Sequence, residues 1–343
     1  MKRLIAVLAT ALLAATTAAC GNGAASGGGD AAAKTIRIAY QAFPSGDLIV
    51  KNRGLLEKAL PDYKITWTKF DSGASINTAF VARSIDIAAI GSSPVARGLS
   101  APLNIPYQVA FVLDMAGDNE ALVARDGTGI TAVSGLRGKK VATPFASTAH
   151  YSLLAALDLA GVKESEVSIV DLEPQDIQAA WTRGDLDAAY TWLPSLDALK
   201  KNGKVLISSR QLATAGKPTL DLGVVSTSFI QAHPDAVDAW RKAESQALDV
   251  IATDPAGAAT TVGAELNLSP GDAQKQLSQG VYLKPADLAS DEWLGTEAKV
   301  GKLADNLVSA AQFLKGQQKI DAVPDLATVQ KSVYVKGLPD VLG

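Results

Sequence analysis

The chain has 343 residues, of which 48% are hydrophobic and 20% are charged, and its formal net charge is −3 at neutral pH. This composition is too apolar for a disordered protein, and the length suits two domains better than one. There is no lysine- or arginine-rich run and no basic stripe, which argues against a nucleic acid as the main partner.

The first twenty residues have the pattern of an export signal. Lys2 and Arg3 precede an uncharged apolar stretch at residues 4–19, which is shorter than the ~20 residues that span a bilayer. The stretch ends at Cys20, the only cysteine in the chain. It resembles a bacterial lipoprotein signal, in which this cysteine is lipid-modified and becomes the new N-terminus, although Thr17 stands where leucine is usual. The alternative is an ordinary signal peptide that contains a cysteine.

The region after Cys20 is rich in glycine and alanine, so residues 21–34 are expected to form a flexible tether. No later stretch is long and apolar enough to suggest a membrane span. We therefore expect an exported protein that a lipid anchors to the outer face of the cytoplasmic membrane.

From Lys34 onward, strand and helix patterns alternate, which is typical of an α/β fold with mainly parallel sheets. The first series predicts strands at 35–40, 64–70, 86–90 and 108–113, and helices at 47–60, 76–84 and 94–101. The second series predicts strands at 120–125, 139–143, 167–172, 187–192, 204–209 and 220–227, with helices after His150 and around Trp181. From Pro234 the pattern is mostly helical, including residues 240–250 and 303–314.

A weak internal repeat favours two similar halves. Residues 83–94 (RSIDIAAIGSSP) and 183–194 (RGDLDAAYTWLP) share an arginine, two alanines and a proline at an offset of one hundred. Each copy predicts a buried strand followed by a turn into a helix. Because ligands of open α/β sheets bind beyond the carboxyl ends of strands, two lobes would each direct one such turn at a shared cleft.

Three of the predicted strand-to-helix turns are rich in hydroxyl groups: residues 70–76 (FDSGASI), 90–95 (IGSSPV) and 144–152 (PFASTAHYS). Serine and threonine at a helix start often serve only as N-caps. The unpaired amides of a helix start can also hold an anion, and three such turns at the same edge favour a binding site. No glycine-rich phosphate loop occurs in the sequence, so a nucleotide is not expected.

Signatures of catalysis and of metal binding are missing from the sequence. The two histidines, His150 and His233, lie far apart, and there is no HExxH, GxSxG or paired-cysteine motif. A hydroxyl nucleophile with His150 as its base is an alternative, but triad members usually come from separate segments. We expect a protein that is not an enzyme and has no cofactor or metal.

Two acids stand out. Glu120 opens one predicted strand, and Asp221 lies between leucines in another, where a carboxylate is costly unless it is paired or hydrated. Each acid either forms a structural salt bridge or provides a counter-charge for a cationic ligand group. Trp192 either packs in the core or covers such a cation.

Seven segments together carry a family resemblance: AYQ (39–41), FDSGASI (70–76), GSSP (91–94), EALV (120–123), HYSLLAAL (150–157), the pattern AAW-RGD-D-AY-W-P at 179–194, and PTLD (218–221). With these residues the chain resembles the taurine-binding proteins of ABC importers, within the broader group of aliphatic sulfonate and nitrate binding proteins. The resemblance runs from about residue 35 to residue 314. After AYQ the chain departs from the usual family continuation, which makes Gln41 a less secure assignment.

The resemblance implies a two-lobed periplasmic-binding-protein fold of type II, with two chain crossings and the ligand in the cleft between the lobes. The expected units are residues 35–115 and 221–343 for one lobe, including C-terminal helices, and residues 116–220 for the other. The implied partners are a membrane permease and its ATPase, and we expect a monomer.

The resemblance also agrees with the chemistry of the turns. Taurine has a sulfonate, which neutral N–H and O–H donors can satisfy, and an ammonium, which calls for an acid. The residues assigned to the sulfonate side are Ser92, Ser93, Ser147, Thr148, His150 and Tyr151. Glu120 and Asp221 are assigned to the ammonium, and Gln41 and Trp192 to the gap between the two groups. Alternative functions are the binding of another aliphatic sulfonate or a sulfate ester, and an enzyme similar to the thiamine-precursor synthases of the same fold.

Overall fold

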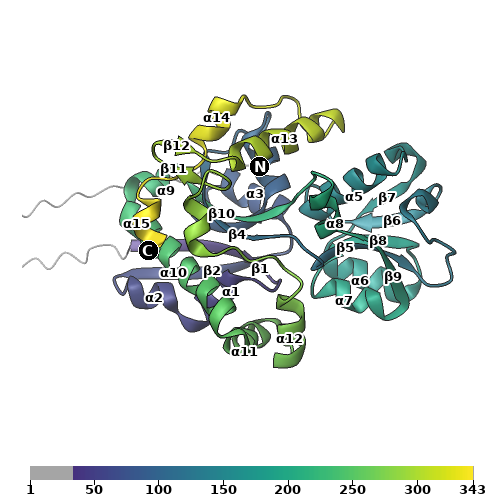
Figure 1. Cartoon of the computed structure of the whole chain (residues 1–343), viewed down its shortest axis with the longest axis horizontal. Helices are drawn as coiled ribbons and strands as arrows, with labels where there is room; N and C mark the ends of the chain where they lie inside the picture. Colours follow the sequence, from purple (N-terminus) through teal and green to yellow (C-terminus); the bar gives the residue numbers. More distant parts are fainter. Residues whose placement is uncertain (1–33, 343) are drawn as a thin grey trace, which may run out of the picture. The chain divides into compact units, whose positions relative to one another are not determined.

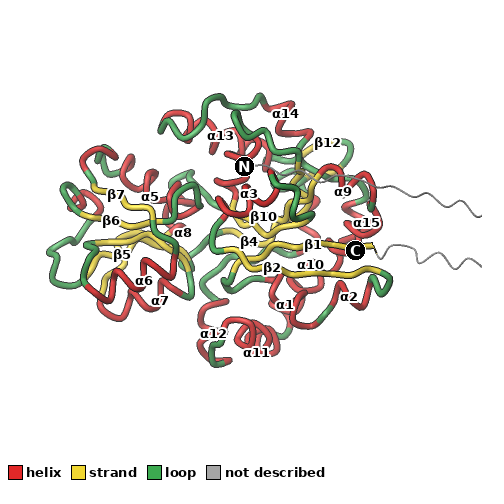
Figure 2. Tube along the Cα trace, turned by 180° about the vertical axis from the view of Figure 1, so that it is seen from behind, coloured by secondary structure: helices red, strands yellow, loops and turns green. Residues whose placement is uncertain are grey.

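The computed structural model describes residues 34–342, and the predicted signal sequence, Cys20 and residues 21–33 of the tether lie outside this range. The described chain forms two five-stranded sheets, each flanked by helices (Figures 1 and 2). The predicted two-lobed α/β fold is confirmed. No helix in this range is long and apolar enough to cross a bilayer.

The first lobe contains a sheet with the strand order β2-β1-β3-β10-β4. Its strands are β1 (Lys34–Gln41), β2 (Tyr63–Phe70), β3 (Ile87–Gly91), β4 (Tyr107–Met115) and β10 (Leu220–Ser226). Its helices are α1 (Gly46–Arg53), α2 (Leu55–Ala59), α3 (Gly73–Val81), α4 (Ser92–Leu99), α9 (Thr227–Ala232), α10 (Pro234–Thr253), α11 (Pro255–Leu266), α12 (Pro270–Leu277), α13 (Leu303–Gly316), α14 (Leu326–Lys331) and α15 (Leu338–Leu342). A short hairpin, β11 (Gly295–Thr296) and β12 (Lys299–Val300), accompanies them.

The second lobe contains a sheet with the strand order β7-β6-β8-β5-β9. Its strands are β5 (Glu120–Arg125), β6 (Lys140–Thr143), β7 (Ser168–Asp171), β8 (Ala188–Trp192) and β9 (Gly203–Ser208). Its helices are α5 (Thr148–Leu159), α6 (Pro174–Arg183), α7 (Ser195–Leu199) and α8 (Ser209–Thr214).

The two sheets share one pattern. In each, the fourth strand in spatial order, β10 or β5, runs antiparallel to both of its neighbours. The strands at the centre of each sheet, β3 and most of β8, are buried on both faces, because helices cover both sides. This explains why β3 and β8 read as short apolar runs without alternation.

The chain passes between the lobes twice, after β4 and before β10. The two crossings lie side by side, since the amide of Ala116 donates to the carbonyl of Thr219 over 2.9 Å.

One predicted helix is divided in the structure. Residues 47–60 were expected to form a single helix, but Gly54 adopts a left-handed conformation (φ 58°) and separates α1 from α2. Glycine takes this conformation without steric cost, so it ends α1 as a C-cap.

Candidate functional site

The topology brings the carboxyl ends of the parallel strands together at the facing edges of the two sheets. The antiparallel strands β5 and β10 run in the opposite direction, so it is their first residues that reach this edge. Glu120 is the first residue of β5 and Asp221 the second of β10. The fold therefore delivers one acid from each sheet to the place where the strand-to-helix turns meet.

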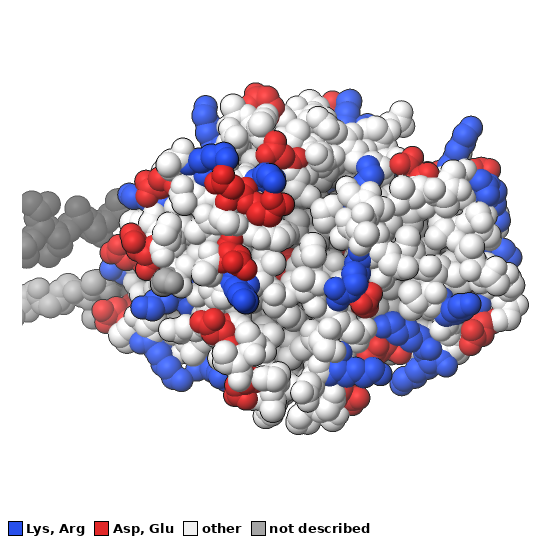
Figure 3. All heavy atoms as spheres, in the orientation of Figure 1, with Lys and Arg blue, Asp and Glu red and all other residues white. Residues whose placement is uncertain are grey.

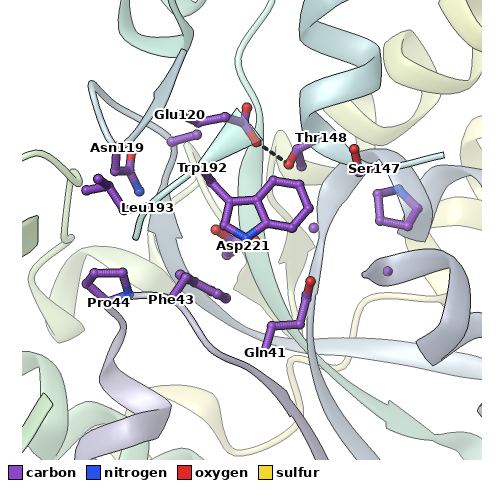
Figure 4. Close-up of a pocket in the computed structure, with 14 residues that line it drawn as sticks. Gln41, Phe43, Pro44, Asn119, Glu120, Ser147, Thr148, Trp192, Leu193 and Asp221 are labelled. Atoms are coloured by element: carbon purple, nitrogen blue, oxygen red, sulfur yellow. Dashed lines mark hydrogen bonds between the residues drawn. The ribbon is translucent and has the colours of Figure 1, made fainter. Parts of the chain in front are cut away.

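A small cavity of about 30 Å³ lies at this edge and is lined by both lobes (Figure 4). Its lining residues are Gln41, Phe43, Pro44, Gly73, Gly91, Pro94, Ala116, Asn119, Glu120, Ser147, Thr148, Trp192, Leu193 and Asp221. None of them is a lysine or arginine. On the outer face shown in Figure 3, by contrast, basic and acidic side chains are interspersed.

Asp221 is the acid of the pocket with the fewest compensating contacts. Its carboxylate accepts no hydrogen bond from a hydroxyl or a basic group among residues 34–342, and its strand pairs it with the fully buried Asp114. Burial and the charges of Glu120 and Asp47 raise the pKa of Asp221 to about 7. The pKa of Asp114 is raised well above its usual value, by burial first and then by the charge of Asp221. This corner of the pocket favours a positive charge on whatever occupies it.

Glu120 has a different environment, because hydroxyl groups surround its buried carboxylate. Thr148 donates to one oxygen over 2.5 Å, as drawn in Figure 4. Ser209 and Ser152 donate to the other oxygen over 2.6 and 3.2 Å, with Thr219 at 3.5 Å. Burial raises the pKa of Glu120, and these hydroxyls oppose that shift.

The hydroxyl groups at the start of α5 form hydrogen bonds within the protein. Ser147 caps the helix by accepting the amide of His150 and gives its own hydrogen to the carbonyl of Pro144 over 2.6 Å. The hydroxyl of Thr148 is committed to Glu120. The amides of Thr148 and Ala149, the first two helical residues, have no partner within the helix. The donors that remain for an anion are therefore main-chain N–H groups.

Of the ten residues predicted for the ligand, the structure brings six to the pocket: Gln41, Glu120, Ser147, Thr148, Trp192 and Asp221. Four others lie outside its lining: Ser92, Ser93, His150 and Tyr151. The Ser92 hydroxyl accepts the amide of Leu220 over 3.0 Å, and the Tyr151 ring packs edge-on against Phe313. Ser93 and His150 line a neighbouring hollow.

Sequence reasoning missed several lining residues, notably Phe43, Pro44, Asn119 and Leu193. Each lies within a few residues of a predicted site residue or a predicted strand end, so position next to a strand end was the available signal. Gly73, Gly91 and Pro94 lie within the quoted turns, but they contribute shape and main chain and no polar side chain.

The lobes touch each other around the pocket. The Ser72 hydroxyl at the start of α3 donates to Glu173 before α6 over 2.8 Å. The methyl group of Thr148 lies over the α-carbon of Gly91, so close that a Cβ on Gly91 would come within 2.5 Å of it. These contacts hold the lobes together near the pocket, and the small volume of the cavity suits a small ligand only.

The arrangement can hold a small molecule that is positive at one end and negative at the other. The Asp221 corner suits a cation, and the amides at the start of α5 suit an anion. Trp192 ends β8 opposite Glu120 in register, and its indole occupies the centre of the pocket view in Figure 4. In residues 34–342, no group of three or more histidine, cysteine, aspartate or glutamate side chains has the arrangement of a metal site.

Comparison with known proteins finds chains of similar sequence. Residues 34–254 match the OpuAC family, described as the substrate-binding domain of ABC-type glycine betaine transport systems. The taurine-binding periplasmic protein of Escherichia coli is 36% identical over 301 residues, which cover 85% of this chain and 90% of that protein.

Two solved structures show the same fold. The alkanesulfonate-binding protein SsuA of Xanthomonas axonopodis pv. citri, bound to MOPS, superimposes with a TM-score of 0.74 at 22% identity, covering 88% of this chain and 98% of that chain. The desulfurization enzyme DszB gives a TM-score of 0.64 at 14% identity, covering 90% of this chain and 99% of that chain.

Proposed function

Since the chain belongs to the family of substrate-binding domains of ABC-type transport systems, we propose that the ligand it captures is taurine, 2-aminoethanesulfonate. The chain is the substrate-binding component of an ABC importer and not an enzyme. Its partner is accordingly an ABC permease, to which it delivers the ligand for import driven by the ATPase.

The observation that carries the taurine proposal is Asp221, a pocket carboxylate without a basic partner among residues 34–342. A ligand ammonium next to it offsets the cost of keeping this group ionised. The sulfonate is held at the opposite side by the amides of Thr148 and Ala149, helped by the dipole of α5. Trp192 and Gln41 line the space between these two ends.

The similarity to the taurine-binding protein of Escherichia coli supports the same ligand. An alkanesulfonate or a sulfate ester has no cation, so it would leave Asp221 uncompensated. Those ligands are therefore the alternative that the first experiment has to separate from taurine. The enzyme alternative rests on fold alone, and the only cysteine of the chain, Cys20, lies in the predicted signal sequence.

The test is thermal unfolding of the protein with taurine, ethanesulfonate, sulfate, nitrate and glycine betaine added separately. A ligand at ~1,000 times its dissociation constant adds about 4 kcal/mol to the free energy of unfolding, which appears as a clear rise in melting temperature. Among the organic ligands, we expect a large shift with taurine only, and sulfate and nitrate serve as controls for the general effect of salts on the melting temperature. An equal shift with ethanesulfonate would rule out a site that depends on the ammonium.

We propose that the two lobes move as the units 35–115 with 221–343 and 116–220. The division of the strands between the two sheets supports these boundaries. The six predicted ligand residues that line the pocket come from both units, so closing one lobe on the other would complete the site.

We also propose that the chain is exported as a monomer and is anchored through a lipid on Cys20. The support is the pattern of residues 1–20, with its positive start, apolar stretch and terminal cysteine. Mass spectrometry of the mature N-terminus tests this. Replacing Cys20 with alanine should release the protein from the membrane fraction, and a protein that stays membrane-bound after this change would contradict the anchor.

A further inference from the structure

A second hollow of about 330 Å³ lies at the contact between the lobes, next to the taurine pocket but with different lining residues. Ser93 and Arg97 reach it from α4 and Lys319 from the stretch after α13, all in the first lobe. His150 reaches it from α5 of the second lobe. The hollow therefore joins side chains that the fold brings from both lobes.

His150 contributes a buried hydrogen-bond donor without an acceptor. Its Nδ1 accepts the amide of Ala146 over 3.1 Å, so the hydrogen of the neutral ring is on Nε2. The Phe145 ring stacks on the imidazole at 4.5 Å and fixes its orientation. His150 is only 3% exposed, and its Nε2 has no hydrogen-bond partner among the described residues. A buried N–H of this kind is destabilising unless an acceptor enters the hollow.

The neighbouring groups are mostly donors as well. Neither the Arg97 guanidinium nor the Ser93 hydroxyl has a hydrogen-bond partner within residues 34–342. Lys319 forms an ion pair with Glu164 at 2.8 Å and retains two further N–H groups. The acid at the rim, Asp171, is exposed and already accepts the amide of Phe145 over 2.8 Å.

We propose that this hollow binds a small tetrahedral oxyanion, such as sulfate or phosphate, which bridges the two lobes. The oxyanion accepts hydrogen bonds from His150 Nε2 and Ser93 in addition to the forked guanidinium of Arg97 and the Lys319 ammonium. A guanidinium matches the geometry of an oxyanion because it can donate two parallel hydrogen bonds to it. A bound sulfate or phosphate also compensates the positive charge of Arg97, which a water molecule cannot do. The lowered pKa of His150, about 4 because of burial and of the charges of Lys319 and Arg97, keeps the ring neutral and Nδ1 available to Ala146.

The hollow also explains why Ser93 and His150 are part of the hydroxyl-rich turns without reaching the taurine pocket. Their polar groups serve a second anion, at a place where both lobes contribute. Because both lobes supply donors to the hollow, it can hold the anion only when the lobes are in contact. Binding of the anion therefore stabilises the closed arrangement of the lobes.

The test is calorimetric titration of the taurine-saturated protein with sulfate and with phosphate, at constant ionic strength. Taurine occupies the first pocket, so any anion site that remains is a different one. Calorimetry is preferable to melting because sulfate raises melting temperatures without binding. We expect one anion to bind to each chain.

Variants locate the site. Arg97→Gln removes the guanidinium, and His150→Asn keeps an acceptor for Ala146 while removing the Nε2 donor. Each variant should lower the affinity for the anion about tenfold or more, as expected when hydrogen bonds to a charged group are lost. Lys64→Gln removes a positive charge from an exposed position of β2 and should leave anion binding unchanged. Taurine affinity, measured by the same titration, serves as the check that each variant is folded.

The outcomes separate this proposal from the proposed function. Absence of anion binding in a wild-type protein that still binds taurine would refute the second site and leave the first intact. Anion binding that survives both Arg97→Gln and His150→Asn would place the anion elsewhere and also refute it. If taurine fails to bind, the same two variants still decide whether a bound sulfate occupies this hollow.

Discussion

Glu120 and Asp221 occupy matching places in the two sheets. Glu120 pairs with Trp192, the last residue of β8, and Asp221 pairs with Gly91, the last residue of β3. Each acid therefore lies at the start of the antiparallel strand, beside the end of the third parallel strand of its own sheet. Their surroundings differ, since hydroxyls satisfy Glu120 while Asp221 faces another carboxyl group. Hydroxyl groups of the protein therefore satisfy one acid of the pair, Glu120, and none contacts the other, Asp221, within residues 34–342.

Replacing Asp221 with asparagine should affect binding and stability in opposite directions. Loss of the carboxylate should weaken the binding of taurine by about 1.5–3 kcal/mol, the usual size of a hydrogen bond to a charged group. It should change the affinity for ethanesulfonate much less. The ligand-free variant should melt higher than the wild type at pH 8, because asparagine cannot ionise. Calorimetry and thermal unfolding measure the two effects. Asp126→Asn, at an exposed residue just after β5, is the matched control, and equal losses for both ligands would contradict the assignment.

Taurine affinity should depend on pH. The pKa of Asp221 is raised to about 7 in the ligand-free protein, and a bound ammonium favours the ionised form. Binding near or below pH 7 therefore releases a proton, and affinity rises with pH until Asp221 is ionised before binding. Calorimetry in buffers of different ionisation enthalpy counts the protons. A pH-independent affinity, equal in wild type and Asp221→Asn, would mean that Asp221 does not meet the ammonium.

The stability of the ligand-free protein should change with pH in the opposite sense. A carboxyl group whose pKa is raised on folding contributes stability that is present below its unfolded value, 3.8, and is lost as pH rises through its folded value. The contributions of Asp221 and Asp47, raised to about 7 and about 6, are thus lost as pH increases from about 4 to 7. Denaturant titrations at a series of pH values measure this loss, which taurine should reduce.

Thr148 should matter mainly through its hydroxyl bond to Glu120. Thr148→Val leaves one buried oxygen of Glu120 without this donor, which should lower the free energy of unfolding by about 1–3 kcal/mol. Thr148→Ser keeps the hydroxyl and should be close to the wild type. Because the amides at the start of α5 remain, the valine variant should retain most of its affinity for the sulfonate end. A tenfold loss of ethanesulfonate binding in Thr148→Val would show that the hydroxyl itself binds the sulfonate.

Gly91→Ala should obstruct the contact between the lobes. The new methyl group would lie 2.5 Å from the Thr148 methyl, and overpacking of this kind costs about 1–3 kcal/mol. We expect weaker binding of every ligand, measured by titration. Gly135→Ala is the control, because a Cβ there comes no closer than 3.5 Å to its neighbours. Combining Gly91→Ala with Thr148→Ser removes the opposing methyl group, and failure of that double variant to recover affinity would contradict the steric explanation.

Most of the fold could be predicted from the sequence because its central strands are short apolar runs between clear helix patterns. The strand β5 was predicted with its observed bounds, and β3 and β8 to within a residue or two. The division of one helix at Gly54 was missed, since glycine inside a helical pattern is often tolerated and only the backbone conformation distinguishes the cases.

The site was predictable in position and only partly in detail. Glu120 was identified because it opens a predicted strand, and Asp221 because it lies between leucines in another. The structure brings both to the same edge because their antiparallel strands begin where the parallel strands end. The direction in which each side chain of α5 points was not available from the sequence. Thr148 and His150 are two residues apart on one helix, and they face different cavities, as neighbours at that spacing do.

The hydrogen bond between Ala116 and Thr219 joins the two crossings, and Ala116 also lines the pocket. If the lobes rotate about these crossings, as proposed above, atoms beside Ala116 shift little and the remote surfaces of the lobes shift most, because displacement grows with distance from the axis. A small displacement at the ligand would then accompany a large displacement at the surface of the lobes. A molecule the size of taurine can in this way change the outline that the whole protein presents to its permease.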